Sequence, residues 1–565
     1  MTWGPELEEL AEKRELSKRM GGTEGIDRQH AQGRLTVRER LEVLLDPDSF
    51  QEVGTMNGVA RYDENDRLVT FRPDSSVRGY GLIDGRKVIL QGGDFTIRGG
   101  ASDGSVNAAG IAGKGRDITS FAADLGVPMI RLLDSSGGSV RNYDLEKPIG
   151  DAASIVHHSI DDPPPDNVEL KPTGVPGSFD VPRHFDASTA APASHNVLLA
   201  NLAQGNLLAQ VPVVSAVLGT VAGAPAVFAG NSHFSVMTKS SDTFVGGPPM
   251  VKQALGIDMT KQELGDYRVQ AQAAGTIHNV AEDEADAFSQ IRRFLSYLPS
   301  NVWQLAPRAE PKDDPNRRDE ELLSFIPRDR HIVYDIYKLI ETVVDKDSTF
   351  EISRLYGRAL VTMLARIDGF PVAVMANNCR YHGGAMTPDA CIKFERFVDF
   401  ANTFHLPIVY FCDVPGFMIG IESEKGGIIR FANHAMAAVT EATIPYITIV
   451  TRRLYGVAGG TAKQNGMGVR YAWPSGESGS LVAEGGVQAA FRREIEAADD
   501  PVAHRAEIEQ RFIKAASVLR QPGLATPMEV IDPRDTRPAI IDYLRMTHSV
   551  NATQLGPKIK VGMRP

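Results

Sequence analysis

The chain has 565 residues and a formal net charge of −11, with 42% hydrophobic and 23% charged residues. This length exceeds what a single hydrophobic core usually supports, so two or more domains are expected. The acidic balance disfavours nucleic acid as the main partner, because phosphate binding needs a basic surface. The three cysteines are too few and too irregularly spaced for a disulfide framework or a zinc site, and no metal is expected.

The N-terminal segment MTWGPELEELAEKRELSKRM (1–20) predicts a charged surface helix, not a signal or transit peptide. No apolar run in the chain approaches the roughly 20 residues that span a bilayer. We therefore expect a cytoplasmic protein without direct membrane insertion.

Four short segments of the first half recur, in the same order, in the second half. They pair LLDPDSFQEVG (44–54) with VVDKDSTFEIS (343–353), LIDGRKVIL (82–90) with RIDGFPVAVMAN (366–377), FAADLGVPMIRLLDSSGG (121–138) with FANTFHLPIVYFCDVPGF (400–417), and VPVVSAVLGTVAGAPAVFAG (211–230) with IPYITIVTRRLYGVAGG (444–460). Asp134 and Asp413 are 279 residues apart, whereas Pro212 and Pro445 are only 233 apart. The first half therefore carries about 46 extra residues, and the Pro-rich stretch 160–194 is predicted to be a long surface loop.

Within each half, buried strands alternate with amphipathic helices. RKVILQGGDF (86–95), VPMIRLLDS (127–135) and VPVVSAVLG (211–219) are short apolar runs typical of buried strands. NAAGIAGKGRDITSFAADLG (107–126) and IIRFANHAMAAVTEAT (428–443) have helical patterns. We predict an α/β fold with largely parallel sheets and two tandem domains, 1–305 and 324–565, joined by a Pro- and charge-rich linker at 306–323.

Two glycine-rich turns follow predicted strands: DSSGGSV (134–140) and YGVAGGTA (455–462). Glycine and alanine at such places let successive backbone N–H groups point at one oxygen, which describes an oxyanion hole. Neither turn fits the dinucleotide fingerprint or the P-loop. Either turn alone is more often a tight connection, but the repetition suggests that two carbonyl compounds are held at once.

The segments GRLTVRERLEVLLDPDSFQEVG (33–54), IVYFCDVPGFMIGIESEKGGIIRFANHAMAAVTEATIPYITIVTRRLYG (408–456) and YAWPSGESG (471–479) resemble the carboxyltransferase (β) subunit of biotin-dependent acyl-CoA carboxylases, of the propionyl-CoA and methylcrotonyl-CoA types. The resemblance implies two tandem crotonase-like (ClpP/crotonase superhelix) domains, the first on the acyl-CoA side and the second on the biotin side. It also implies a homo-hexamer in which domains of different subunits meet. The family moves a carboxyl group from carboxybiotin to the α (or vinylogous) carbon of an acyl-CoA through enolate intermediates.

The resemblance also implies roles for residues of this chain. Gly137 and Gly138 would hold the thioester carbonyl, and Val457 and Ala458 the ureido oxygen of biotin. The first turn has one residue more than the family's Asp-Ser-Gly-Gly, so an ungapped alignment would place its donors at Ser136 and Gly137. Further candidates are, for substrate binding, Ser136, Ala222 and Gly223, and, for cofactor binding, Gly426, Gly427, Tyr455, Gly456, Gly459 and Gly460. Biotin serves as the base in this family, so no catalytic histidine is required, and His382 in RYHGGA is more often a structural residue.

The sequence contains no lysine flanked by methionines, as biotinylation would need, and no ATP-binding module of the biotin carboxylase type. A separate biotin carboxylase and biotin carboxyl carrier subunit is therefore the expected partner, with coenzyme A thioester as substrate. Two alternatives stay open: the carboxyltransferase subunit of a biotin-dependent acyl-CoA decarboxylase, and a catalytically silent scaffold. Gly460 stands where short-chain family members often carry Asp, which favours a substrate other than the simplest acetyl or propionyl thioesters.

Overall fold

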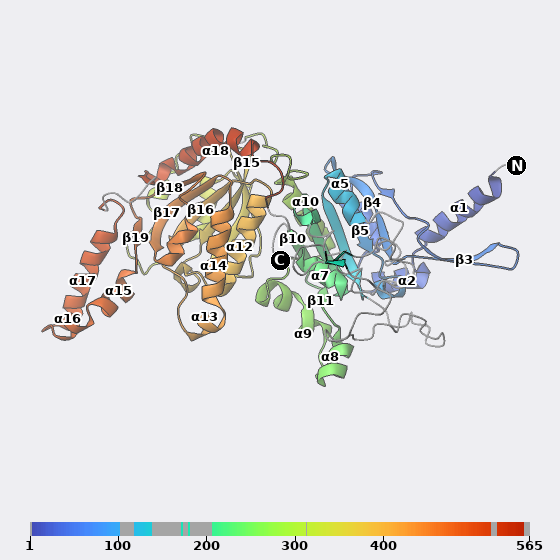
Figure 1. Cartoon of the computed structure of the whole chain (residues 1–565), viewed down its shortest axis with the longest axis horizontal. Coiled ribbons are helices and arrows are strands. Elements are labelled where there is room, and N and C mark those ends of the chain that lie inside the picture. The colour runs from blue at the N-terminus through green and yellow to red at the C-terminus, as the bar shows by residue number, and fades with distance from the viewer. Residues whose placement is uncertain are drawn as a thin grey trace.

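The chain folds into two halves that lie side by side along the long axis of the molecule (Figure 1). The computed structural model describes residues 3–101, 118–137, 206–311, 313–520 and 528–558, together with the backbone of two short paired strands, β7 (Lys171–Pro172) and β8 (Phe179–Asp180). Gly138 and most of the 160–194 insertion lie outside the described residues.

Each half is built around one eight-stranded mixed sheet. The strands of the first sheet are β1 (Gln51–Glu52), β4 (Ser76–Ile83), β5 (Arg86–Gly93), β6 (Met129–Ser135), β9 (Val213–Ala222), β10 (Phe234–Thr238), β11 (Asp242–Phe244) and β12 (Asn279–Ala281). Their order is β1-β4-β5-β6-β9-β10-β12, and β11 also pairs with β9. Strands β5, β6, β9, β10 and β12 run parallel, as buried apolar strands in α/β folds do.

The second sheet repeats this topology strand for strand. Its members are β13 (Phe350–Glu351), β14 (Leu360–Ile367), β15 (Phe370–Asn377), β16 (Ile408–Val414), β17 (Tyr446–Tyr455), β18 (Gly468–Ala472), β19 (Glu477–Gly479) and β20 (Met528–Val530). Their order is β13-β14-β15-β16-β17-β18-β20, and β19 pairs with β17 as β11 pairs with β9. The sequence repeat is thus confirmed as a structural repeat.

The repeat extends to individual hydrogen bonds. Asp46 accepts from the backbone N–H groups of Asp84 and Gly85, at 3.0 and 2.8 Å. Asp345 accepts from the equivalent Asp368 and Gly369 at the same two distances. Each Asp-Gly pair forms the hairpin turn into the next strand, with both residues at positive φ.

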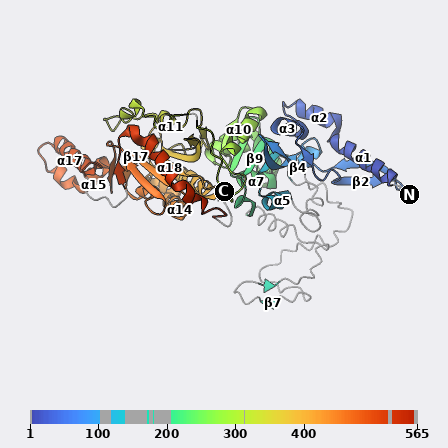
Figure 2. The same cartoon turned by 90° about the horizontal axis from the view of Figure 1, so that it is seen from above.

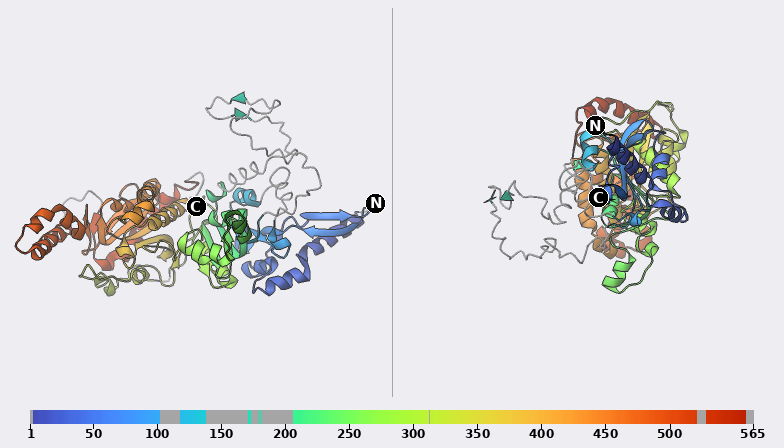
Figure 3. Two further views of the ribbon diagram at one scale, coloured as in Figure 1. Left: turned by 90° about the horizontal axis from the view of Figure 1, so that it is seen from below. Right: turned by 90° about the vertical axis from the view of Figure 1, so that its right-hand side faces the viewer.

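Helices cover the two sheets. In the first half these are α1 (Gly4–Lys18), α2 (Gly22–His30), α3 (Val37–Leu44), α5 (Ile118–Leu125), α7 (Ala224–Gly230), α8 (Pro248–Leu255), α9 (Lys261–Gly265), α10 (Glu284–Ser296), the 3-10 turn η1 (Arg98–Gly100) and the π-helix η4 (Arg268–Ala273). The expected N-terminal helix is α1, which packs beside the hairpin of β2 (Gly58–Tyr62) and β3 (Leu68–Pro73). Both project from one end of the molecule (Figures 2 and 3).

The helices of the second half are α11 (Ile336–Val343), α12 (Pro388–Thr403), α13 (Ile421–Lys425), α14 (Ile428–Glu441), α15 (Ala483–Ala490), α16 (Arg492–Glu496), α17 (Pro501–Ala516), α18 (Thr536–Ala552) and the 3-10 turns η5 (Glu320–Leu323), η6 (His382–Gly384), η7 (Val457–Thr461) and η8 (Pro533–Asp535). Helix α14 confirms the prediction made for 428–443. Helices α15 to α17 form the end of the molecule opposite α1 (Figure 1). Among the helices that the structure describes, none combines the length and apolarity that crossing a bilayer requires.

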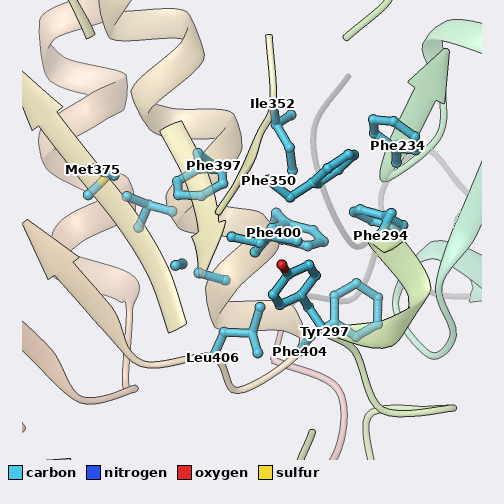
Figure 4. Close-up of a cluster of buried hydrophobic side chains, with 14 of the residues drawn as sticks. Phe234, Phe294, Tyr297, Phe350, Ile352, Met375, Phe397, Phe400, Phe404 and Leu406 are labelled. Carbon is cyan, nitrogen blue, oxygen red and sulfur yellow. The ribbon is translucent and has the colours of Figure 1, made fainter. Parts of the chain in front are cut away.

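An aromatic cluster joins the two halves (Figure 4). Phe234 of β10 stacks on Phe294 of α10 with ring centroids 4.7 Å apart and meets Phe350 of β13 at 5.5 Å. Phe294 in turn contacts Phe400 of α12 at 5.7 Å. All four rings are buried. The halves therefore share one continuous hydrophobic core, and at 306–323 Arg308 pairs with Asp368 of the second half.

Lys393 of α12 lies close to this junction, and its environment predicts that the stability of the fold depends on pH. It is buried, and its ammonium donates to the carbonyl oxygens of Ser353, Tyr356 and Leu360 at 2.8, 3.0 and 2.8 Å. Burial lowers the pKa of Lys393 to about 7. Between that value and the ordinary lysine pKa of about 10.4, the unfolded chain binds this proton and the folded chain does not, so stability rises with pH.

We expect the free energy of unfolding of the wild type, from urea titrations at pH 7 and pH 9, to increase more steeply with pH than that of Lys393→Met. The same substitution at the exposed Lys346 serves as control. Equal pH slopes for the wild type and Lys393→Met would show that Lys393 keeps its proton throughout this range.

Candidate functional site

The first candidate turn begins where β6 ends. The N–H of Ser136 donates to the carbonyl of Gly99 at 3.0 Å, and the Ser135 hydroxyl donates to the carbonyl of Gly100 at 2.6 Å. The N–H of Gly137, whose φ is 81°, donates to the Ser135 hydroxyl at 3.2 Å. Both N–H groups are occupied, but the partner of Gly137 is a side-chain hydroxyl, which can rotate away, so this geometry favours Gly137 over Ser136 as a donor to a ligand.

The structure brings Gly137 against the end of the neighbouring strand β9. A Cβ atom on Gly137 would lie 2.8 Å from the carbonyl oxygen of Ala222 and 3.7 Å from Cα of Gly223. Only glycine allows so close an approach with φ at 81°. The structure therefore brings together, at one end of the first sheet, candidates from two separate segments of the sequence: Gly137 from one, and Ala222 and Gly223 from the other.

The second candidate turn follows β17. Gly456 has φ 63° and ψ −157°, and its N–H donates to the carbonyl of Gly479 at 2.9 Å. Its counterpart Gly223 has φ 68° and ψ −136°, so both copies use a conformation that is essentially restricted to glycine. Val457 and Ala458 open η7, and the first N–H groups of a helix precede any intrahelical acceptor. Val457 is 69% exposed and Ala458 is buried.

The remaining cofactor candidates surround η7. Gly427 caps α14 with φ 83°, and Gly426 caps the end of α13, so both form the entry into α14. A Cβ on Gly460 would lie 3.2 Å from Sδ of Met436, which places η7 against α14. Tyr455 is buried and its hydroxyl donates to Glu477 at 3.0 Å, whereas Gly459 N–H donates to Gly456 O at 3.0 Å.

The two copies of the duplicated turn differ in one chemically decisive residue. With Gly223 equivalent to Gly456, Pro225 stands in the first half where Ala458 stands in the second. Proline has no N–H, so only the second copy offers two successive backbone donors. The first copy instead lies beside Gly137.

A second proline explains why the turns η1 and η6 are hydrogen-bonded by different kinds of donor. Pro415 is equivalent to Ser136, so the second half lacks the N–H that binds the Gly99 carbonyl in the first half. The equivalent carbonyl, Gly383 O, accepts instead from Nη2 of Arg453 at 2.6 Å. A side chain thus replaces a main-chain donor at the same place, and His382 at φ 51° matches Arg98 at φ 54°.

A buried ionic cluster supports the first turn. Arg40 of α3 donates to Asp134 at 3.0 Å and, through Nε and Nη2, to Glu284 at 2.8 Å each. Gln29 adds a bond to Asp134 at 2.9 Å. Burial disfavours the charged guanidinium, but Glu284 and Asp134 outweigh it, and the net pKa of Arg40 is raised.

The second half has an equivalent cluster around Asp413, which is fully buried at the end of β16. Arg452 and Arg453 donate to its carboxylate at distances from 2.7 to 3.2 Å, and Tyr334 donates at 3.0 Å. Burial raises the pKa of this carboxyl, but the two guanidiniums outweigh burial and hold it below its ordinary value. Both arginines lie three to four residues before Gly456, so Asp413 anchors the strand that carries the second turn.

Within the part of the chain that the structure describes, no group of His, Cys, Asp and Glu is arranged to hold a metal ion. The three cysteines are buried and free.

Comparison with known proteins gives consistent matches. The family described as "Carboxyl transferase domain" matches residues 28–147 and 199–560. The propionyl-CoA carboxylase carboxyltransferase subunit of Haloferax mediterranei is 32% identical over 558 residues, which is 98% of each chain. The methylmalonyl-CoA carboxyltransferase 12S subunit of Propionibacterium freudenreichii subsp. shermanii is 32% identical over 98% of this chain and 96% of its own.

Two further matches concern the direction of carboxyl transfer and the fold. The methylmalonyl-CoA decarboxylase subunit alpha of Veillonella parvula is 30% identical over 96% of each chain. The solved structure of transcarboxylase 12S with methylmalonyl-coenzyme A and methylmalonic acid bound superposes with a TM-score of 0.80 and 30% identity, covering 97% of this chain and 96% of that one.

Proposed function

The chain belongs to the carboxyl transferase domain family, with two crotonase-like halves, and from this premise we propose that it is the carboxyltransferase subunit of a biotin-dependent acyl-CoA carboxylase. It would move a carboxyl group from biotin on a partner subunit to the α (or vinylogous) carbon of an acyl-CoA. The observation that carries this proposal is that the two halves differ in the backbone N–H donors that they offer at equivalent strand ends. The Gly137 N–H lies just after β6 in the first half, and the N–H groups of Val457 and Ala458 begin η7 just after β17 in the second. Pro225 removes a donor from the duplicate turn of the first half.

The first half is proposed to bind the acyl thioester. Gly137, together with Gly138, would direct N–H groups at the thioester oxygen, where negative charge develops when the α-carbon loses its proton. A thioester oxygen would take the place of the Ser135 hydroxyl at the Gly137 N–H. Ser136, Ala222 and Gly223 would line the path of the acyl chain.

The second half is proposed to bind biotin. When bound, biotin carries the carboxyl group and supplies the base. Val457 and Ala458 would donate to its ureido oxygen, and Gly456, Gly459 and Gly460 would let the ring approach the main chain. Gly426, Gly427 and Tyr455 would shape the cleft. The N–H groups of Val457 and Ala458 begin η7 and therefore have no acceptor within that turn, which supports the fit.

We propose that the two turns face each other between copies of the chain, in a homo-hexamer, because they lie in different halves of one chain. Large apolar side chains stand exposed around both: Val227, Val245, Met250 and Leu255 in the first half, and Ile419, Ile421, Ile429 and Leu481 in the second. Exposed apolar patches of this kind mark interaction surfaces. Helices α8 and α13 project along the same edge of the molecule (Figure 1), which suits pairing through that edge.

The test is the reverse half-reaction. Purified protein is mixed with free biotin and a panel of carboxyacyl-CoAs that includes malonyl-, methylmalonyl- and 3-methylglutaconyl-CoA, and the release of acyl-CoA is measured. We expect biotin-dependent release with one member of the panel. Release that does not need biotin would contradict the proposal. Intact assembly with CoA bound and no turnover of any member would favour a silent scaffold.

A second candidate is the same subunit working in a decarboxylase, and the similarity to the methylmalonyl-CoA decarboxylase subunit alpha favours it. The chemistry at the two turns is shared, so the half-reaction would be positive in both cases. Isolation of the native complex distinguishes them, because only a carboxylase is expected to co-purify with an ATP-dependent biotin carboxylase.

A further inference from the structure

A groove of about 670 Å³ lies in the second half, apart from both donor turns. Its walls come mainly from residues 322–330, residues 473–477 after β18, and residues 513–520 at the end of α17. Arg452 of β17 and Pro533 complete the lining. Strand β19 separates it from the second turn. Glu477 at one end of β19 lines the groove, whereas Gly479 at the other end binds Gly456.

The lining of the groove carries an excess of positive charge. Arg328, Lys514 and Arg520 line it with exposed side chains, and none of the three forms an ion pair with a described carboxylate. The one carboxylate in the lining, Glu477, is already held by Arg330 at 3.0 Å and by the Tyr455 hydroxyl at 3.0 Å. In a chain of net charge −11, three uncompensated cations around one groove repel each other, and a bound anion would relieve that repulsion.

Apolar side chains line the same groove. Leu323 and Leu519 line it while 52% and 64% exposed, beside Ile326 and the fully buried Trp473. Leucines exposed next to cations are suited to a ligand that is anionic at one end and apolar or aromatic at the other. A volume of this size is typical of small-molecule sites.

We propose that this groove binds an organic phosphate, with the phosphate among Arg328, Lys514 and Arg520 and an aromatic or apolar group against Leu323, Ile326 and Leu519. Free nucleotides and coenzyme A share this chemistry. The proposal does not depend on the transfer reaction, because the groove contains none of the proposed donors of either turn.

The experiment is isothermal titration of the full-length protein with ADP, coenzyme A, adenosine and inorganic phosphate. Two double variants are compared with the wild type: Arg328→Glu with Arg520→Glu in the groove, and Arg493→Glu with Arg511→Glu, exposed residues that do not line it. Both variants change the net charge equally. Near-native circular dichroism and an equal melting temperature establish that each is folded.

We expect saturable ADP binding at one site per chain, weakened about tenfold or more in the groove variant and unchanged in the control variant. Adenosine and inorganic phosphate are each expected to bind more weakly than ADP, because adenosine cannot pair with the cations and phosphate cannot contact the apolar side chains. If coenzyme A is the natural ligand, the number of coenzyme A sites per chain is greater by one in the wild type than in the groove variant.

Three results would overturn the proposal. They are the absence of saturable binding of both ADP and coenzyme A, equal weakening in the two double variants, and inorganic phosphate binding as tightly as ADP. None of these depends on whether the reverse half-reaction succeeds, so the two proposals fail separately.

Discussion

Replacing Val457 with proline is expected to lower the kcat of the biotin half-reaction by about 10²–10³-fold while leaving the fold intact. Proline removes the N–H of residue 457, one of the two donors proposed for the biotin oxygen. The position tolerates the ring, because Val457 is the first residue of η7 and proline is favoured there. The ψ of Gly456, −157°, lies outside the α region that a following proline disfavours.

The matched control is Val457→Ala, which keeps the N–H and removes only an exposed side chain. It is expected to retain transfer to within a few-fold. The measurement is steady-state biotin-dependent release of acyl-CoA, with the melting temperature of each variant recorded alongside. Equal rates for the proline and alanine variants would exclude the Val457 N–H as a donor in the reaction.

Replacing Arg40 with methionine is expected to destabilise the first half by about 3–5 kcal/mol. Arg40 and Asp134 are fully buried, and Glu284 is nearly so. Without the guanidinium, two carboxylates would be left in the core without their cationic partner, at the strand end that leads into the first turn. Denaturant unfolding followed by circular dichroism measures the loss.

Arg38→Met, two residues earlier on the same helix, is the control for this variant. The Arg38–Glu52 pair lies at 2.9 Å but is partly exposed, and such pairs contribute about 0.2–1 kcal/mol. A comparable loss from both substitutions would mean that the buried cluster adds no more to stability than a surface pair does.

The sequence predicts the architecture well because short local sequence patterns identify the repeat. Short apolar runs, Asp-Gly turns and Val-Ala-Gly strand ends recur in one order, and the two sheets have the topology that this order implies. The glycines at 223 and 456 could be anticipated because few other residues adopt their conformation. Pro225 already aligns with Ala458 in the sequence repeat, so the missing donor can be read from the sequence as well.

The buried clusters could not be predicted in the same way. Arg40 and Asp134 are 94 residues apart in the chain, and Arg40 and Glu284 are 244 apart. Their pairing depends on how α3 and α10 pack against the sheet, which no local pattern specifies. The hydrogen bond by which Arg453 replaces a missing main-chain donor could not be predicted for the same reason. Only the folded chain places its guanidinium at the Gly383 carbonyl.

The aromatic contact between the halves has a mechanical consequence. Phe234, Phe294, Phe350 and Phe400 belong to one core, so the halves could not hinge without exposing these rings to water. The chain is then a rigid spacer that holds its two donor turns at a constant separation. If the proposed function holds, the reacting groups would be brought into reach by movement of the biotin-bearing partner and by assembly of several copies, and not by bending of the chain.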